Sequence, residues 1–163
     1  MIIRELNSEE QFPQHPFEDR LTSIADDPIR PELPLDFRIA SNRHIYTNEG
    51  AIVCMAWCND VPTTIAEMTM MSTNMWPPDY RKKDVAVFYT VWSYTRGAGK
   101  DLIVNLFDML SNELPNSKYV TLSPKTEMAK KFHTKNGAKL LNENVSSYNF
   151  EYETKPMRRS ATI

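Results

Sequence analysis

A strand, a glycine-containing turn and a helix follow one another directly in residues 86–114, and this succession strongly constrains the fold. Residues 86–94 are rich in β-branched and aromatic side chains and are apolar on both faces, which predicts a strand in the interior of a sheet. From residue 102 onward, apolar side chains recur at spacings of three and four, which predicts an amphipathic helix that Pro115 ends. We therefore expect a central strand with a helix packed against it.

The turn between this strand and this helix has the chemistry of an anion site. Residues 95–100 include Gly97 and Gly99, two of the four glycines in the chain. The first amides of a helix have no internal partner and the helix dipole adds positive charge there, so a phosphate can bind where glycine lets it approach the backbone. A tight turn without any ligand would also explain the two glycines, and both interpretations stay open.

Two common nucleotide motifs do not fit this turn. A P-loop needs Ser or Thr after its Gly-Lys pair, but Asp101 follows Lys100, and a dinucleotide fingerprint needs a third glycine where Leu102 stands. The turn instead resembles the Gln/Arg-x-x-Gly-x-Gly/Ala loop of the GNAT acyltransferase superfamily, with Tyr94 where Gln or Arg is usual. In that family the loop amides hold the pyrophosphate of coenzyme A. The resemblance implies acetyl-CoA or another acyl-CoA as co-substrate and the following binding residues: Val91, Trp92, Arg96, Gly97, Ala98, Gly99 and Lys100.

The remaining segments predict an α/β (α+β) fold. Residues 63–72 fit either a strand or a helix. The order of the predicted strands and helices along the chain resembles that of the GNAT superfamily. This resemblance implies a mixed, mostly antiparallel sheet flanked by helices, in which the central strand is followed by a glycine loop and a helix. Further strands are expected at residues 1–6, 37–47, 51–58, 118–122, 138–141 and 147–153.

A second long helix is expected after residue 122. Ser123 is a good N-cap and Pro124 suits the first helical position. A left-handed cap at Asn136 and Gly137 is expected to close this helix. Its apolar face is expected to consist of three side chains: Met128, Ala129 and Phe132.

Residues 9–37 contain five prolines, which predicts an extended surface segment with at most a short helix over residues 16–25. A long segment of this kind either covers a site or wraps the core. Acceptor pockets lie in variable loops, so this segment and residues 74–83 are the places where we expect an acceptor substrate to bind.

Composition and charge exclude several classes of protein. The net charge of −2 gives no general attraction to nucleic acid or to a membrane, and no apolar run reaches membrane-spanning length. Cys54 and Cys58 predict buried free thiols rather than a metal site, which fits a cytoplasmic location. The length of 163 residues predicts one domain, over residues 1–153, with residues 154–163 as a flexible tail. The resemblance to the GNAT superfamily implies that this domain binds an acyl-CoA.

Two motifs in the second half of the chain suggest catalytic residues. Residues 128–138 resemble the Ala-x-x-Phe-Tyr-x-x-x-Gly-Phe helix of the same superfamily, whose tyrosine often protonates the departing thiolate. His133 stands in the tyrosine's place, where it could act as a general acid near neutral pH or lie on the surface of the helix near its C-terminus. Glu67, in an apolar run, could be a general base if it faces a cleft, or a solvated residue.

A narrower resemblance, to the catalytic domain of malonyl-CoA decarboxylases, rests on Leu122-Ser123-Pro124 and on Phe132-His133-x-x-Asn136-Gly137-Ala138. Those enzymes use a serine and a histidine in such segments, so Ser123 is a catalytic candidate besides its role as a helix cap. If residues 124–135 form one straight helix, Ser123 and His133 are ~15 Å apart at the helical rise per residue, too far to cooperate.

These features together predict a coenzyme A-dependent acyltransferase of GNAT type that passes an acetyl or similar acyl group to a small-molecule or peptide amine. The candidate catalytic residues are His133, Ser123 and Glu67. Two alternatives stay open: decarboxylation of the malonyl-CoA decarboxylase kind, and a structural or binding module without chemistry. No metal, nucleic acid or membrane is expected as a partner, and a homodimer is compatible with the sequence.

Overall fold

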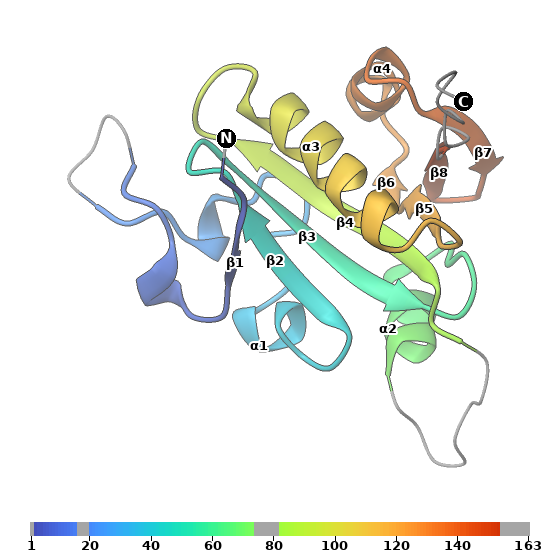
Figure 1. Ribbon diagram of the computed structural model, residues 1–163, viewed down its shortest axis with the longest axis horizontal. Helices are drawn as coiled ribbons and strands as arrows, with labels where there is room; N and C mark the ends of the chain where they lie inside the picture. Colours follow the sequence, from blue (N-terminus) through green and yellow to red (C-terminus); the bar gives the residue numbers. More distant parts are fainter. Residues whose placement is uncertain (1, 16–19, 74–81, 154–163) are drawn as a thin grey trace, which may run out of the picture.

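The computed structural model describes residues 2–15, 20–73 and 82–153 (Figure 1), so the expected tail and most of the loop at residues 74–83 lie outside the described residues. The described chain forms an eight-stranded sheet in the order β1-β2-β3-β4-β5-β8-β6, with β7 paired to β8 beside this path. The strands are β1 (Arg4–Leu6), β2 (Arg43–Thr47), β3 (Ala51–Cys58), β4 (Val85–Ser93), β5 (Lys118–Thr121), β6 (Ser123–Pro124), β7 (Lys139–Glu143) and β8 (Ser147–Tyr152).

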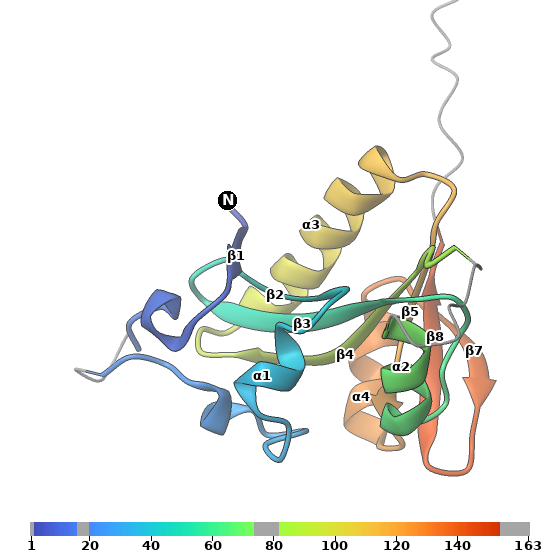
Figure 2. The same ribbon diagram turned by 90° about the horizontal axis from the view of Figure 1, so that it is seen from below.

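Helices cover both faces of this sheet. They are the 3-10 helices η1 (Glu9–Gln11) and η2 (Ile24–Asp26) and the α-helices α1 (Leu35–Arg38), α2 (Ile65–Ser72), α3 (Ala98–Glu113) and α4 (Glu127–Lys135). Figure 2 shows α3 on one face and α1 and α2 on the opposite face, while α4 packs against β7 and β8. None of the helices in the described ranges is both long enough and apolar enough to cross a membrane.

The sheet has the class that the sequence predicts. Its neighbouring strands pair antiparallel except for β4 and β5, which are parallel. β3 and β4 are almost wholly buried because helices cover both of their faces, and β4 leads through the glycine turn into α3 as expected. Cys54 and Cys58 in β3 are buried free thiols, as predicted, and burial raises the pKa of each to about 12.

β4 and β5 stay paired over only four residues and then separate. The last hydrogen bond between them runs from the Leu122 amide to the Phe88 carbonyl, at 2.9 Å. The next amide that the chain after β5 would contribute to a parallel ladder belongs to Pro124, which has no N–H to donate. The strand that follows β5, β6, pairs with β8 instead, and no strand of the described ranges pairs with the second half of β4 on that side.

A bulge in β4 lies at the point of separation. In the register with β3, Cys54 faces Thr90 and Met55 faces Phe88, so Tyr89 is one extra residue in β4. An extra residue bends the bulged strand and increases its twist, which turns the rest of β4 away from β5.

The second predicted long helix begins later than expected. Ser123 and Pro124 form β6, and the N-cap of α4 is Thr126, whose hydroxyl accepts a hydrogen bond from the Ala129 amide. The prediction that Ser123 caps this helix is therefore wrong, because pairing with β8 draws Ser123 and Pro124 into the sheet. The left-handed position after the helix is confirmed, since Gly137 has a φ of 99°.

Three other segments differ from, or refine, the expectations. The strand predicted at residues 37–47 is shorter, because α1 and a positive φ of 66° at Asn42 delay the start of β2. Residues 63–72, which fit either a strand or a helix, contain helix α2. Of the short helix expected over residues 16–25, the first four residues lie outside the described residues and the last two belong to η2.

The segment before β2 is anchored by a buried ion pair rather than lying extended on the surface. Asp27 and Arg38 are both 0% exposed, and Arg38 Nη1 donates to Asp27 Oδ2 at 2.7 Å. The Asp27 carboxylate also accepts hydrogen bonds from the Thr90 hydroxyl of β4 and from the Ile29 and Arg30 amides. These bonds fix the segment to the central strand.

We expect Asp27→Asn to lower the free energy of unfolding by about 3–5 kcal/mol, because it leaves the Arg38 charge buried without its counter-charge. The matched control is Glu49→Gln, which removes the same charge from an exposed pair with Arg4 and should cost about 1 kcal/mol or less. Urea unfolding of both variants measures the difference. Equal losses of unfolding free energy would show that the buried pair stabilises the protein no more than the exposed pair does.

Candidate functional site

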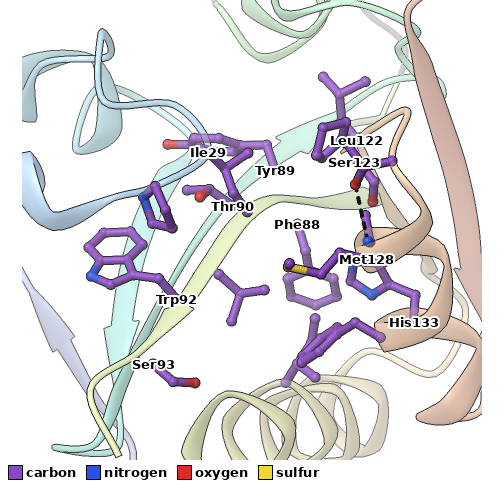
Figure 3. A pocket seen from close by; sticks show the side chains of 17 residues that line it. Ile29, Phe88, Tyr89, Thr90, Trp92, Ser93, Leu122, Ser123, Met128 and His133 are labelled. Atoms are coloured by element: carbon purple, nitrogen blue, oxygen red, sulfur yellow. Dashed lines mark hydrogen bonds between the residues drawn. The ribbon is translucent and has the colours of Figure 1, made fainter.

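A cavity of about 580 Å³ occupies the gap where β4 leaves β5. Figure 3 shows it between β4, which carries Trp92 and Ser93, and α4, which carries Met128 and His133. Its lining comes from both faces of the sheet, because Ile103 of α3 and Ile29 of the anchored N-terminal segment also contribute. The cavity therefore lies where the sheet itself is interrupted.

The described residues that line the cavity are uncharged at neutral pH. Most of them are aliphatic or aromatic, and the polar groups among them are a few hydroxyls, one imidazole and one indole N–H. The volume falls within the roughly 300–1,000 Å³ of small-molecule sites. Such a lining suits a neutral, extended part of a ligand that is oriented by a few hydrogen bonds. The side chains with polar groups are Tyr89, Thr90, Trp92, Ser93, Ser123, Thr126 and His133.

His133 lies on the buried face of α4 and is only 6% exposed. Its Nδ1 is hydrogen-bonded to the Tyr152 hydroxyl at 2.8 Å, and its ring stacks on Phe150. Burial lowers the pKa of His133 to about 4, so the imidazole is uncharged at neutral pH. The alternative of a surface histidine is wrong, because α4 turns His133 inward and leaves Met128 82% exposed. A catalytic role of His133 stays a prediction.

Ser123 lines the same cavity from β6 and is 3% exposed. Its hydroxyl donates to Thr121 Oγ1 at 2.8 Å, whereas His133 bonds to Tyr152, so the two candidates do not bond to each other. The expected separation of ~15 Å assumed one straight helix. That assumption is wrong, because Ser123 belongs to the sheet.

Glu67 lies outside the cavity, in the first turn of α2. Its carboxylate accepts hydrogen bonds from the Thr63 hydroxyl and from the Thr63 amide, and these bonds lower its pKa. The Thr64 hydroxyl in turn accepts from the Glu67 amide. This reciprocal arrangement resembles a capping box, so the geometry gives Glu67 a role at the helix start.

The residues expected to bind coenzyme A fall into two groups. Val91 and Trp92 line the cavity, whereas the five turn residues lie beyond its edge at the start of α3. The two regions meet at Ser93, which lines the cavity and whose hydroxyl accepts from the Gly99 amide at 2.8 Å. A Cβ at Gly99 would lie 2.5 Å from this hydroxyl oxygen, and Gly97 has a φ of 84°, so both positions favour glycine.

The start of α3 carries backbone donors that the described residues leave free. No hydrogen bond within the described ranges uses the amides of Arg96, Gly97 and Lys100, whereas the Gly99 amide is taken by the Ser93 hydroxyl. The N-cap residue is Gly97, which has no side chain to accept from the helix. The side chains of Arg96 and Lys100 are exposed, and Asp101 is the acidic residue of the first turn. Free amides at the positive end of a helix beside two cations have the chemistry that attracts a phosphate group.

Tyr94, which replaces the usual Gln or Arg of the resembled loop, is held by its own hydrogen bonds. Its hydroxyl accepts from Trp92 Nε1 at 2.8 Å and donates to Asp26 Oδ2 at 2.9 Å. The Tyr94 amide also donates to the Gly50 carbonyl at 2.8 Å. Tyr94 thus ties the glycine turn to η2 and to the β2–β3 connection.

The sequence interpretation missed the residues that shape the cavity from the N-terminal segment. Arg30 donates from Nε to the Tyr89 carbonyl and from Nη2 to the Leu122 carbonyl, both at 3.0 Å. Asp27 and Arg38 hold the backbone around it. Only the unusual charges within a proline-rich stretch hinted at them, since their partners are distant in the sequence. Nowhere in the described ranges do three or more potential metal ligands cluster.

Comparison with solved structures finds two kinds of similar protein. Malonyl-CoA decarboxylase from Cupriavidus metallidurans matches 53% of this chain at 19% identity and a TM-score of 0.39, and the match spans only 24% of that protein. An N-acetyltransferase from Campylobacter jejuni matches 71% of this chain and 70% of its own at 11% identity and a TM-score of 0.47.

A GNAT-family acetyltransferase from Listeria monocytogenes matches 69% of this chain and 64% of its own length, at 10% identity and a TM-score of 0.45. These two kinds of protein are also the ones that the sequence motifs resemble. The likeness concerns the course of the chain and assigns no activity. No family model and no curated protein sequence matches the chain.

The stability of the protein should fall in acid partly because of His133. The pKa of His133 is about 4 in the folded chain against an ordinary value of 6.5. The contribution of neutral His133 to the free energy of unfolding is therefore fully present above pH 6.5 and is lost as the pH falls toward 4. The shift corresponds to a loss of roughly 3 kcal/mol.

His133→Gln, which stays uncharged, should flatten the acid limb of stability relative to the parent protein. Urea unfolding of both proteins from pH 7 down to about 4 measures the difference, because all other titrating groups are shared. Parallel stability curves would mean that His133 titrates equally in the folded and unfolded chains.

Proposed function

We propose that this chain is a coenzyme A-dependent acyltransferase that passes an acetyl or similar acyl group to an amine. One observation carries the proposal. An uncharged cavity in the interrupted sheet continues through Ser93 to the start of α3, where free amides and two exposed cations gather. An acyl-CoA has the same sequence of chemistries, with a neutral thioester arm followed by a pyrophosphate.

The proposed reaction needs an uncharged amine and a place for one proton. The amine nitrogen attacks the thioester carbonyl carbon, the C–N bond forms, and the C–S bond breaks as the intermediate collapses. The nitrogen loses a proton and the departing sulfur gains one, so the reaction is balanced. His133 is uncharged at neutral pH, and its Nε2 has no hydrogen-bond partner among the described residues. In the tautomer whose Nδ1–H donates to the Tyr152 hydroxyl, Nε2 could accept the proton from nitrogen and return it to sulfur.

A second candidate is decarboxylation of a malonyl-CoA-like thioester, in which a C–C bond breaks, carbon dioxide leaves and the carbanion is protonated. The observation that favours it is that Ser123 and His133 line one cavity. The uncharged lining speaks against it, since the described lining residues offer no cation to hold the substrate's carboxylate. We therefore rank it second.

The cellular setting forms part of the same proposal. Two buried free thiols fit a reducing compartment such as the cytoplasm.

The proposed acceptor is a small-molecule or peptide amine that reaches the cavity beside the anchored N-terminal segment, where Ile29 lines the cavity. A homodimer stays a prediction.

Two reactions test the proposal directly. The protein is incubated with acetyl-CoA and a panel of amines, and separately with malonyl-CoA alone. We expect thiol release that depends on an amine in the first reaction and no carbon dioxide in the second. Ala129→Phe, which fills the cavity, should reduce acetyl-CoA affinity about tenfold or more, whereas Ala66→Phe on the exposed face of α2 should not.

The other results are equally informative. Carbon dioxide from malonyl-CoA without an amine would favour the second candidate. Neither product, combined with no rise in melting temperature at millimolar coenzyme A, would leave a structural or binding module as the best account, since a ligand of the native state must stabilise it.

The glycine turn can be tested apart from the cavity. Arg96→Glu should weaken coenzyme A binding about tenfold, because hydrogen bonds to charged groups are worth more than 1 kcal/mol. It should leave binding of S-acetyl-pantetheine, which lacks the pyrophosphate, unchanged. Lys139→Glu in β7 is the control for net charge. Calorimetry measures the affinities of both ligands. Equal weakening for both would show that the turn does not bind the pyrophosphate.

A further inference from the structure

A single arginine spans the gap at the point where β4 and β5 separate. Arg30 Nε donates to the Tyr89 carbonyl and Nη2 donates to the Leu122 carbonyl, each at 3.0 Å. Tyr89 is the bulge residue of β4, and the Leu122 amide makes the last bond of the β4–β5 ladder. The guanidinium therefore lies directly beyond the last ladder hydrogen bond.

The arginine replaces the strand pairing that stops there. In a continued parallel ladder, the Leu122 carbonyl would accept from an amide of β4, but the bulge turns β4 away. Partly buried carbonyls need a donor, and a planar guanidinium can supply two in a fixed geometry. One side chain thus joins both strands where their backbones no longer reach each other.

Arg30 is itself held in place by the buried ion pair. Its amide donates to Asp27 Oδ1 at 3.1 Å, and its carbonyl accepts from Arg38 Nη2 at 2.6 Å. Asp27 is also bonded to the Thr90 hydroxyl, next to the bulge. The backbone from which the Arg30 side chain projects is therefore fixed relative to β4.

The hydrogen-bond partners of Arg30 indicate that it links two backbone segments rather than forming an ion pair. Within the described ranges, Arg30 forms no salt bridge, and both of its side-chain hydrogen bonds go to backbone carbonyls. Its two partner residues, Tyr89 and Leu122, line the cavity, and so does its chain neighbour Ile29. A change at Arg30 would therefore move three parts of the lining at once.

We propose that Arg30 is a positioning residue that sets the width of the opening between β4 and β5 and so limits the cavity to short acyl groups. The limit on acyl size rests on the proposed function, whereas the bridge does not. Charge attraction toward an anionic ligand is the competing role, and a lysine separates the two. Lysine keeps the charge but lacks the planar fork that holds two carbonyls together.

The first test does not involve coenzyme A. Arg30→Lys and Arg30→Met are compared with Arg4→Met, which alters an exposed arginine in β1. Hydrogen exchange at the Leu122 amide reports on the last ladder bond, and amides of β3 serve as the reference for global opening. We expect faster exchange at Leu122 in both Arg30 variants and no change in the control.

The second test measures the affinities of acetyl-CoA and octanoyl-CoA by calorimetry. We expect the parent protein to prefer acetyl-CoA about tenfold or more, and both Arg30 variants to lose most of this preference. Unchanged exchange at Leu122 would overturn the bridge. Parental exchange and preference in Arg30→Lys would assign Arg30 to charge attraction instead. If the parent protein binds no acyl-CoA at all, the proposed function and the limit on acyl size both fail, and the exchange data alone decide on the bridge.

Discussion

A parallel strand pair that stops after four residues leaves backbone groups that must be satisfied without a strand, and the rest of this structure depends on how the chain meets that requirement. The bulge at Tyr89 turns β4 aside, and Pro124 removes the next donor from the opposite strand. β8 then takes β6 as its partner. The interruption is thus built into the backbone, and the cavity is the space between the two diverging strands.

The buried ion pair makes this interruption tolerable. Removing two charges from water is costly, and the cost is offset only when the remaining hydrogen-bonding groups are satisfied as well. Asp27 accepts from a hydroxyl and two amides besides Arg38, and Arg38 donates to two carbonyls besides Asp27. The saturated pair holds the segment that carries Arg30 against β4. The stability of the segment and the shape of the cavity therefore have one physical origin.

Local patterns predicted the parts of the fold that local interactions determine. The central strand, the glycine turn and α3 follow from composition, from spacing and from Pro115, and Gly137 ends α4 as expected. Ser123 was misassigned because a good capping sequence competes with pairing to a strand more than twenty residues later in the sequence, and the pairing prevails. The buried face of α4 carries His133 rather than Met128.

The residues that shape the candidate site were beyond prediction for a similar reason. Asp27 and Arg38 are eleven residues apart, and the partners of Arg30 lie 59 and 92 residues away, so no local period connects them. A charged residue in a proline-rich stretch is most simply interpreted as solvated, because buried charges are rare unless they are paired. Pairing of this kind becomes visible only when the sheet brings β4 to the segment.

The uncharged lining of the cavity also constrains the proposed reaction. A cavity without charged side chains disfavours an ammonium ion, since desolvation lowers the pKa of an amine. The acceptor would therefore enter after losing its proton to water, already in its nucleophilic form. A carboxylate base inside the cavity would be costly to keep ionised and would not be needed for this step. The depressed pKa of His133 agrees with the same principle, because the surroundings that favour a neutral amine also keep the imidazole neutral. Only the proton released when the amide forms then needs a carrier. A neutral imidazole whose Nδ1–H donates to Tyr152 can accept that proton at Nε2, for which no residue of the described ranges is a partner.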